Sequence, residues 1–169
     1  WVKQFSNKTA DTVLSFNTKD EITARCIGPA KHIQLLLQDS VDDNLQFKSE
    51  VDTKHPLYVV SKFVKSRINQ TDKQNVFNFA DKFRELTMPP YGLFKSHAGY
   101  GMLAFALRPY VDKVFDTNGK PINAQRMQEL IDDTFKIWDG ASSNIHKVDV
   151  KFETKEEGCT VVHLIRTNK

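Results

Sequence analysis

Apolar side chains recur at helical spacing through the middle of the chain. Before the Pro89-Pro90 pair, the apolar positions are Leu57, Val60, Val64 and Ile68 in one run and Val76, Phe79, Ala80, Phe83 and Leu86 in the next. Positions three or four apart share one helix face, so the pattern predicts two amphipathic helices, the first beginning at Pro56. The second must end by Met88, because proline supplies no backbone donor and disfavours helical backbone in the residue before it.

Two further helices are predicted after this pair of prolines. Ser96 is a suitable N-cap for an apolar helix over residues 98–115, and Pro109 should kink it because it cannot donate to the carbonyl of Phe105. Asn123 is a suitable N-cap for the next helix, which should end at Gly140. We expect the 98–115 helix, the most apolar of the chain, to be the central and buried one.

The N-terminal third is expected to be irregular and to contain β structure. Residues 12–16 and 21–27 alternate around the polar residues 17–20, which predicts a β-hairpin. Residues 31–37 form a short apolar run that suits either a helix or a buried strand.

The C-terminal end predicts a strand and leaves one element undecided. Val148, Val150 and Phe152 alternate with polar residues, as in a half-buried strand. Residues 154–157 form a capping box, which favours a final helix. A hairpin that leads into the β-rich run 159–165 fits the same residues.

Together these elements predict an α+β fold, a predominantly helical single domain with small β elements near both ends. We expect mixed β and loop structure over residues 1–55, a helical core over 56–140, and a strand plus a helix or hairpin over 141–169. The length of 169 residues suits one domain. Because the chain begins with the apolar Trp1 and not with a methionine, we expect it to be a fragment of a longer protein.

Charge gives limited support for a nucleic-acid partner. The chain is 40% hydrophobic and 27% charged, with a net charge of only +3, which is typical of a globular domain. Two adjacent helices could nevertheless bring six basic residues onto one surface: Lys62, Lys65, Arg67, Lys73, Lys82 and Arg84. Asp72, Asp81 and Glu85 interrupt this surface, so nucleic acid is a candidate partner and not a secure one.

The start of the 98–115 helix carries the motifs closest to a small-ligand site. Residues 99–104 match G-x-G-x-x-A, but the buried strand that a dinucleotide fingerprint needs before it is missing, so we expect no cofactor. Instead, the small residues should let this helix cross a neighbour closely. Lys95, Ser96 and His97 could bind an anion at the same helix start. An enzyme site around His97, Gly99 and Gly101 is therefore the alternative function.

Other chemistries have no motif in the sequence. The histidines lack the spacing of a metal site, and neither a P-loop nor a G-x-S-x-G elbow occurs. No apolar run approaches the length that spans a membrane. Cys26 and Cys159 have no C-x-x-C spacing, which favours a reducing compartment. We expect no metal, no cofactor and no membrane contact, and a cytoplasmic location.

Three segments resemble an accessory region of large bacterial ATPase-like proteins of the restriction and phage-defence type. They are residues 88–92 (Met-Pro-Pro-Tyr-Gly), 99–108 (Gly-Tyr-Gly-Met-Leu-Ala-Phe-Ala-Leu-Arg) and 118–122 (Asn-Gly-Lys-Pro-Ile). The resemblance implies a helical module downstream of a nucleotide-binding domain, and it carries over no functional residue. The favoured function is a non-catalytic accessory or interaction domain of a larger intracellular protein. Its partner would be the remainder of the parent chain or another protein.

Overall fold

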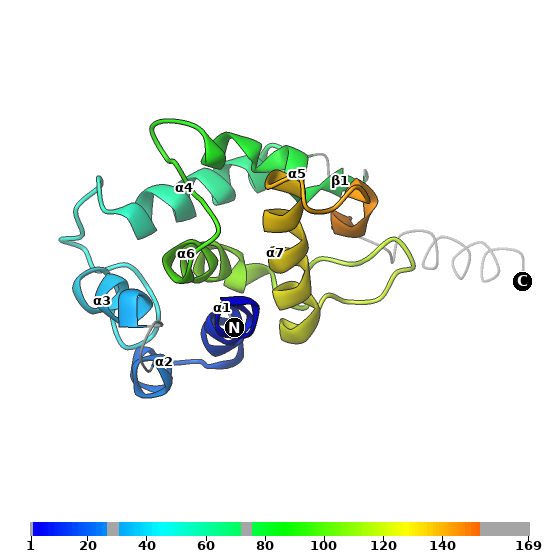
Figure 1. Ribbon diagram of the computed structural model, residues 1–169. Coiled ribbons are helices and arrows are strands. Elements are labelled where there is room, and N and C mark those ends of the chain that lie inside the picture. Colours follow the sequence, from blue (N-terminus) through cyan, green and yellow to red (C-terminus); the bar gives the residue numbers. More distant parts are fainter. Residues whose placement is uncertain (1, 27–30, 72–75, 153–169) are drawn as a thin grey trace, which may run out of the picture.

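The fold is a set of helices built around one central helix, α6, as Figure 1 shows. The computed structural model describes residues 2–26, 31–71 and 76–152. The α-helices are α1 (Val2–Ser15), α2 (Lys19–Arg25), α3 (Lys31–Ser40), α4 (Pro56–Asn69), α5 (Phe79–Lys82), α6 (His97–Leu107) and α7 (Ala124–Trp138). The shorter elements are the 3-10 turns η2 (Arg84–Thr87), η3 (Arg108–Tyr110) and η4 (Ile145–Val148) and the strands β1 (Phe77–Asn78) and β2 (Asp149–Val150). The predominantly helical fold with a little β structure is confirmed.

Helix α6 is enclosed by its neighbours. It packs against α1, α3, α4 and α7, and Figure 1 shows α4 above it, α1 below it and α7 to its right. Eight of its eleven residues are buried. A helix that is apolar on every side has to be buried in this way, so the expectation that it is the central helix is confirmed.

Two glycines allow this close enclosure. A methyl group added at Gly99 would lie 2.2 Å from the backbone oxygen of Phe94, and one added at Gly101 would lie 2.7 Å from Cδ1 of Ile33 on α3. Neither position has room for a Cβ atom without movement of a neighbour. The small residues of the G-x-G-x-x-A motif therefore serve the packing of α6, as the sequence indicates.

A buried polar cluster joins α6 to α7. The Tyr100 hydroxyl donates to Oδ1 of Asp132 at 2.6 Å, and Nζ of Lys136 lies 2.7 Å from Oδ2 of the same carboxylate. Burial raises the pKa of Asp132, but the hydrogen bonds from Lys136 and Tyr100 outweigh this effect and lower it. The Tyr100 ring stacks on Phe135 with a centroid separation of 4.7 Å. The cluster thus holds one charged carboxylate inside the α6–α7 contact with both oxygens satisfied.

The predicted hairpin of residues 12–16 and 21–27 is wrong, because residues 12–15 belong to α1 and residues 21–25 to α2. Thr9, Ala10, Val13 and Leu14 are all buried, which is a helical spacing that brings adjacent residues to one face. The polar residues between the two segments are a helix start. Thr18 Oγ1 accepts from the Glu21 backbone N–H, and Glu21 Oε2 accepts from the Thr18 backbone N–H. This capping box begins α2.

The run at residues 31–37 forms part of helix α3, which buries Ile33 and Leu37. The predicted second helix over residues 76–86 is divided into β1, α5 and η2, since Asn78 pairs with Asp149 of β2 and its Oδ1 caps α5 at Asp81 N. The sheet therefore begins in the middle of the chain and not near its N-terminus.

The ends of the later helices differ from the prediction at one point. Pro109 does not kink a helix over residues 98–115, because α6 ends at Leu107 and the 3-10 turn η3 follows. The caps at Ser96 and Asn123 are confirmed. Helix α7 ends at Trp138, as expected from Gly140, whose φ is +72°.

The C-terminal strand is shorter than predicted. Val148 and Val150 are buried as expected, but Val148 belongs to η4 and β2 has only two residues. The undecided helix or hairpin over residues 154–165 lies outside the described residues, as does Cys159. Within the described ranges, no helix is long and apolar enough to cross a membrane.

Substituting the two glycines tests whether packing governs α6. Exchanging glycine for alanine in a helix ordinarily raises stability, by up to about 1 kcal/mol. We expect the opposite sign for Gly99→Ala, a loss of about 1–3 kcal/mol in the free energy of unfolding, because its methyl group meets a backbone oxygen. Gly101→Ala should also lose stability, because the added methyl group would lie 2.7 Å from Cδ1, 3.0 Å from Cγ1 and 3.1 Å from Cβ of the fully buried Ile33. Urea denaturation measures both changes, and a more stable Gly99→Ala protein would contradict the packing account.

Candidate functional site

Five of the six basic residues predicted to form one surface lie on described elements, α4, α5 and η2. Three are on α4, one is on α5 and one is in η2: Lys62, Lys65, Arg67, Lys82 and Arg84, respectively. Lys73 lies outside the described residues.

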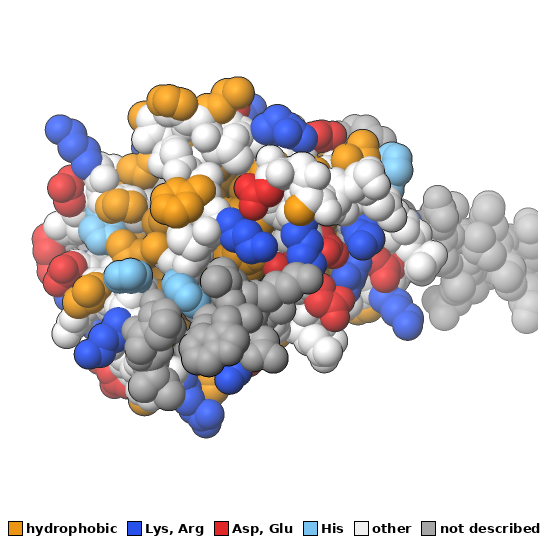
Figure 2. Space-filling model, viewed as in Figure 1, with side chains coloured by type: hydrophobic (Ala, Val, Ile, Leu, Met, Phe, Trp, Pro, Cys, Tyr) orange, Lys and Arg blue, Asp and Glu red, His pale blue; other side chains and the backbone are white. Residues whose placement is uncertain are grey.

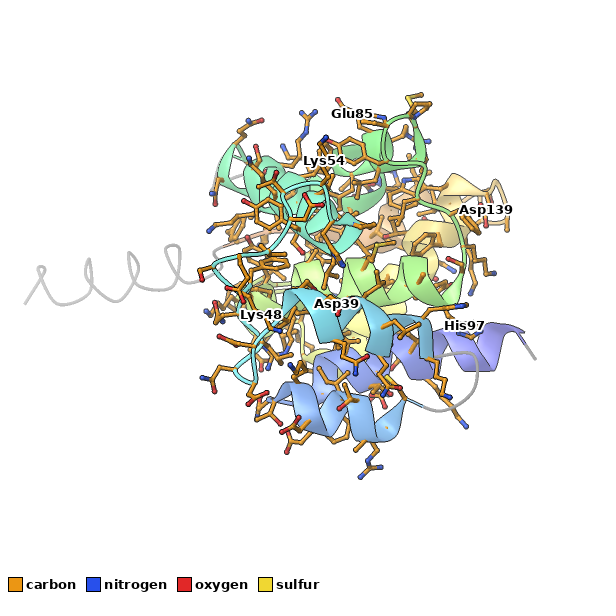
Figure 3. The ribbon with its side chains drawn as sticks, turned by 90° about the vertical axis from the view of Figure 1, so that its left-hand side faces the viewer. Asp39, Lys48, Lys54, Glu85, His97 and Asp139 are labelled. Atoms are coloured by element: carbon orange, nitrogen blue, oxygen red, sulfur yellow. The ribbon has the colours of Figure 1, made fainter. Side chains whose placement is uncertain are left out.

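Carboxylates pair with two of these basic residues. Nη2 of Arg67 lies 2.5 Å from Oε1 of Glu85, and the Arg67 guanidinium also lies over the ring of Phe63 at 5.0 Å from its centroid. Nη2 of Arg84 lies 3.4 Å from Oδ1 of Asp81. Glu85 is labelled at the top of Figure 3. The α5 and η2 side of the predicted surface is therefore a mixed-charge face.

Lys62 and Lys65 instead line a cleft at the other side of α4. Both side chains are exposed, and neither ammonium group forms an ion pair with any residue that the structure describes. The cleft has a volume of about 470 Å³ and lies between α4, the loop after α3 and the C-terminal end of α6. We call it the α4–α6 cleft.

Aromatic side chains form much of the wall of the α4–α6 cleft. The ring of Phe47 stands edge-on to Tyr58 and to Phe105, with centroid separations of 5.2 Å and 5.5 Å. Tyr110 of η3 lies on the same cleft, and burial raises the pKa of its phenol, which therefore stays neutral. Phe47, Tyr58 and Tyr110 are only half-buried, so part of each side chain remains open to contact.

The loop after α3 is held so that Phe47 reaches this position. Oδ1 of Asp42 accepts from the backbone N–H groups of Asn44 and Gln46, at 2.9 Å and 3.0 Å. Leu45 adopts a φ of +61° within this turn, and its side chain is buried. Phe47 then pairs with Val41 as an isolated antiparallel bridge. The chain thus reverses within a few residues and brings an aromatic ring back onto α6.

Arg108 lines the cleft and has a structural role. Its Nε and Nη2 donate to the backbone oxygen of Phe16 at 3.2 Å and 3.0 Å, which ties the end of α6 to the end of α1. Burial lowers the pKa of Arg108, but a guanidinium stays charged in proteins. Its charge therefore adds to the positive potential of the cleft.

Ser61 supplies an unused hydroxyl on the same face of α4. It lines the cleft, and its buried Oγ has no hydrogen-bond partner among the described residues. A serine hydroxyl can both donate and accept a hydrogen bond. Rotation about the Cα–Cβ bond would turn it toward a ligand in the cleft.

The lining of the α4–α6 cleft is basic and aromatic, and none of its residues is acidic, a histidine or a cysteine. The cleft offers cations, aromatic rings and a hydroxyl, which bind anions and flat rings.

The predicted anion site at the start of α6 is assembled, but its groups already have partners. Ser96 Oγ accepts from the Gly99 backbone N–H at 3.0 Å, and Nδ1 of His97 lies 3.2 Å from Oγ1 of Thr9 on α1. Burial and then the nearby His32 lower the pKa of His97, so the ring is mostly neutral at neutral pH. A neutral ring adds no positive charge for an anion. Anion binding by Lys95, Ser96 and His97 stays a prediction.

The two candidate sites lie at opposite ends of α6. In Figure 3, His97 is labelled on the right, and Lys48, the neighbour of Phe47, on the left. An eleven-residue helix is about 16 Å long. One small ligand cannot occupy both sites.

An apolar hollow lies beside the start of α6. It is lined by Leu35 and by Phe94, which are 59% and 70% exposed, together with His32 and His55. Figure 2 shows histidine side chains next to hydrophobic ones on this face. Within the described part of the chain, no group of three or more metal-ligating side chains is positioned to hold an ion. The hollow is an apolar surface edged by His32, His55 and the carboxylate residue Asp39.

The α4–α6 cleft could be found only in part from the sequence. Tyr58, Lys62 and Lys65 repeat at helical spacing along α4, so a stripe of mixed aromatic and basic residues is visible there. Phe47 and Tyr110 come from segments far apart in the chain, and no local pattern relates them to α4.

The lowered pKa of His97 predicts a pH-dependent stability. In the unfolded chain the imidazole titrates near its ordinary pKa of about 6.5, whereas the folded protein binds this proton only at lower pH. The unfolded state therefore takes up the proton first, so the stability contributed by neutral His97 is present above about pH 6.5 and is lost as the pH falls below that value. His97→Asn should lose less stability than the wild type on acidification. Identical pH profiles in urea denaturation would contradict this assignment.

The chain has also been compared with known proteins. No protein-family model, curated protein or solved structure matches it. The functional argument therefore depends on the geometry of the α4–α6 cleft.

Proposed function

We propose that this chain is a non-catalytic accessory domain of a larger intracellular protein and that it contacts nucleic acid through the α4–α6 cleft. The observation that carries the proposal is the pair Lys62 and Lys65 at a cleft without carboxylates. The two lysines stand three positions apart on α4, so their side chains leave the same side of the helix.

Phosphate is the ligand group that such a pair fits. An ammonium group on a long flexible stem binds a phosphate oxygen as a point charge, without strict geometry. The guanidinium of Arg108, which also lines the cleft, raises the local potential further. Contacts of this kind supply most of the sequence-independent affinity of proteins for nucleic acids.

A role within a larger protein is supported by two other observations. The resemblance of residues 88–92, 99–108 and 118–122 is to an accessory region of large bacterial ATPase-like proteins. The exposed side chains of Leu35 and Phe94 form an apolar surface of the kind that contacts other proteins. We propose that this surface faces the remainder of the parent chain or another protein.

Neutralising the two cleft lysines tests the nucleic-acid contact. The double variant Lys62→Gln/Lys65→Gln should bind a fluorescein-labelled oligonucleotide about tenfold more weakly, because two screened charge contacts are lost. The slope of log K against log salt concentration should also become shallower by about 2. Fluorescence anisotropy over a salt series measures both quantities.

The matched control removes two charges from the mixed-charge face. Lys82→Gln/Arg84→Gln has the same net charge as the cleft variant, and both of its residues belong to the surface predicted from the sequence. Because Arg84 is already paired with Asp81, we expect this control to bind almost as tightly as the wild type. Equal losses in the two double variants would contradict the cleft as the contact site, and wild-type binding that ignores salt would contradict the proposed function.

A further inference from the structure

We infer that the α4–α6 cleft holds one unstacked nucleotide of a single strand, with the base among the aromatic rings and the phosphates at Lys62 and Lys65. This inference rests on the proposed function and names its ligand class. It follows from the size of the cleft, the chemistry of its wall and the position of its cations.

The size of the cleft suits a single nucleotide. Its volume of about 470 Å³ lies within the range of about 300–1,000 Å³ that is usual for small-molecule sites. A base inside a duplex has both faces covered by its neighbours, so only an unpaired base can lay a ring face against the aromatic wall of the cleft.

The wall offers aromatic surface for the base. Phe47 is fixed between Tyr58 and Phe105 by edge-to-face contacts, so Tyr58 is held in place by its neighbour. Tyr58 and Tyr110 are half-buried and line the cleft from two different elements. Bases stack on aromatic side chains with little regard to sequence, which is how many single-strand binding proteins hold them.

The polar groups are arranged to suit the remaining parts of a nucleotide. Lys62 and Lys65 follow Tyr58 along one face of α4, so the two ammonium groups and the Tyr58 ring lie on the same side of the helix, at the cleft. Ser61 lies on the same face, and its unpartnered hydroxyl can bond to a base edge after a rotamer change. A groove that combines cations with aromatic rings is the usual design for single strands.

The test separates base stacking from phosphate contact. Wild-type protein should bind labelled oligothymidylate at least about fivefold more tightly than an abasic strand of the same length, because only the first can stack a base. Tyr58→Leu keeps an apolar side chain but removes the ring, so it should abolish most of this preference, whereas Tyr58→Phe should retain it. Lys62→Gln/Lys65→Gln should weaken both strands alike and leave their ratio unchanged.

Competition experiments distinguish a single strand from a duplex and from a free nucleotide as the ligand. A duplex of the same length and free thymidine monophosphate are measured as competitors, and both should compete at least about fivefold less well than the single strand. Equal competition by duplex, or an unchanged strand preference in Tyr58→Leu, would overturn the inference while leaving the proposed function intact. Competition by the free nucleotide as strong as that of the strand would overturn the single strand as the ligand. Absence of binding to every nucleic acid would overturn the proposed function and the inference together.

Discussion

The enclosure of α6 is the constraint on which the rest of the structure depends. This helix has neighbours on every side, so its residues must be apolar or small all round. Gly99 and Gly101 are required where Phe94 and Ile33 come closest. The polar group that enters this core, the Tyr100 hydroxyl, is tolerated because it donates to the carboxylate of Asp132, which Lys136 also pairs. Burial of α6 thus accounts for its composition and for the charged cluster at its contact with α7.

The same enclosure places the α4–α6 cleft. Helix α6 must end at Leu107, because Pro109 cannot continue it, and Arg108 then turns back to hold the carbonyl of Phe16. This ending leaves space between the last turn of α6 and the exposed face of α4. Phe47 closes the space from the loop after α3. The rings of the cleft are therefore held by packed neighbours, which reduces the conformational entropy that they lose on binding.

Sequence reasoning succeeds here where the pattern is local and complete. The 3.6-residue periodicity identifies α4 and α7, and single polar residues identify the caps at Ser96 and Asn123. It fails at α1, because the adjacent buried pair Val13 and Leu14 does not alternate, and at α2, because the Thr18 capping box begins a helix where the sequence predicts the loop of a hairpin. It also fails at β1, where Phe77 leaves the helical pattern to pair with a residue more than seventy positions away. Of the cleft, only the stripe of Tyr58, Lys62 and Lys65 on α4 could be predicted, since the other walls meet it through tertiary packing.

One measurement tests the central claim most directly, namely that nucleic acid binds at the C-terminal end of α6. Backbone amide resonances of the labelled protein would be followed by NMR during titration with oligothymidylate. The account predicts that the shifted resonances form one continuous group from Phe47 through Tyr58 and Lys65 to Tyr110. Shifts centred on Lys95 and His97, or on the hollow at Leu35 and Phe94, would contradict it, because those residues lie at the opposite end of the helix.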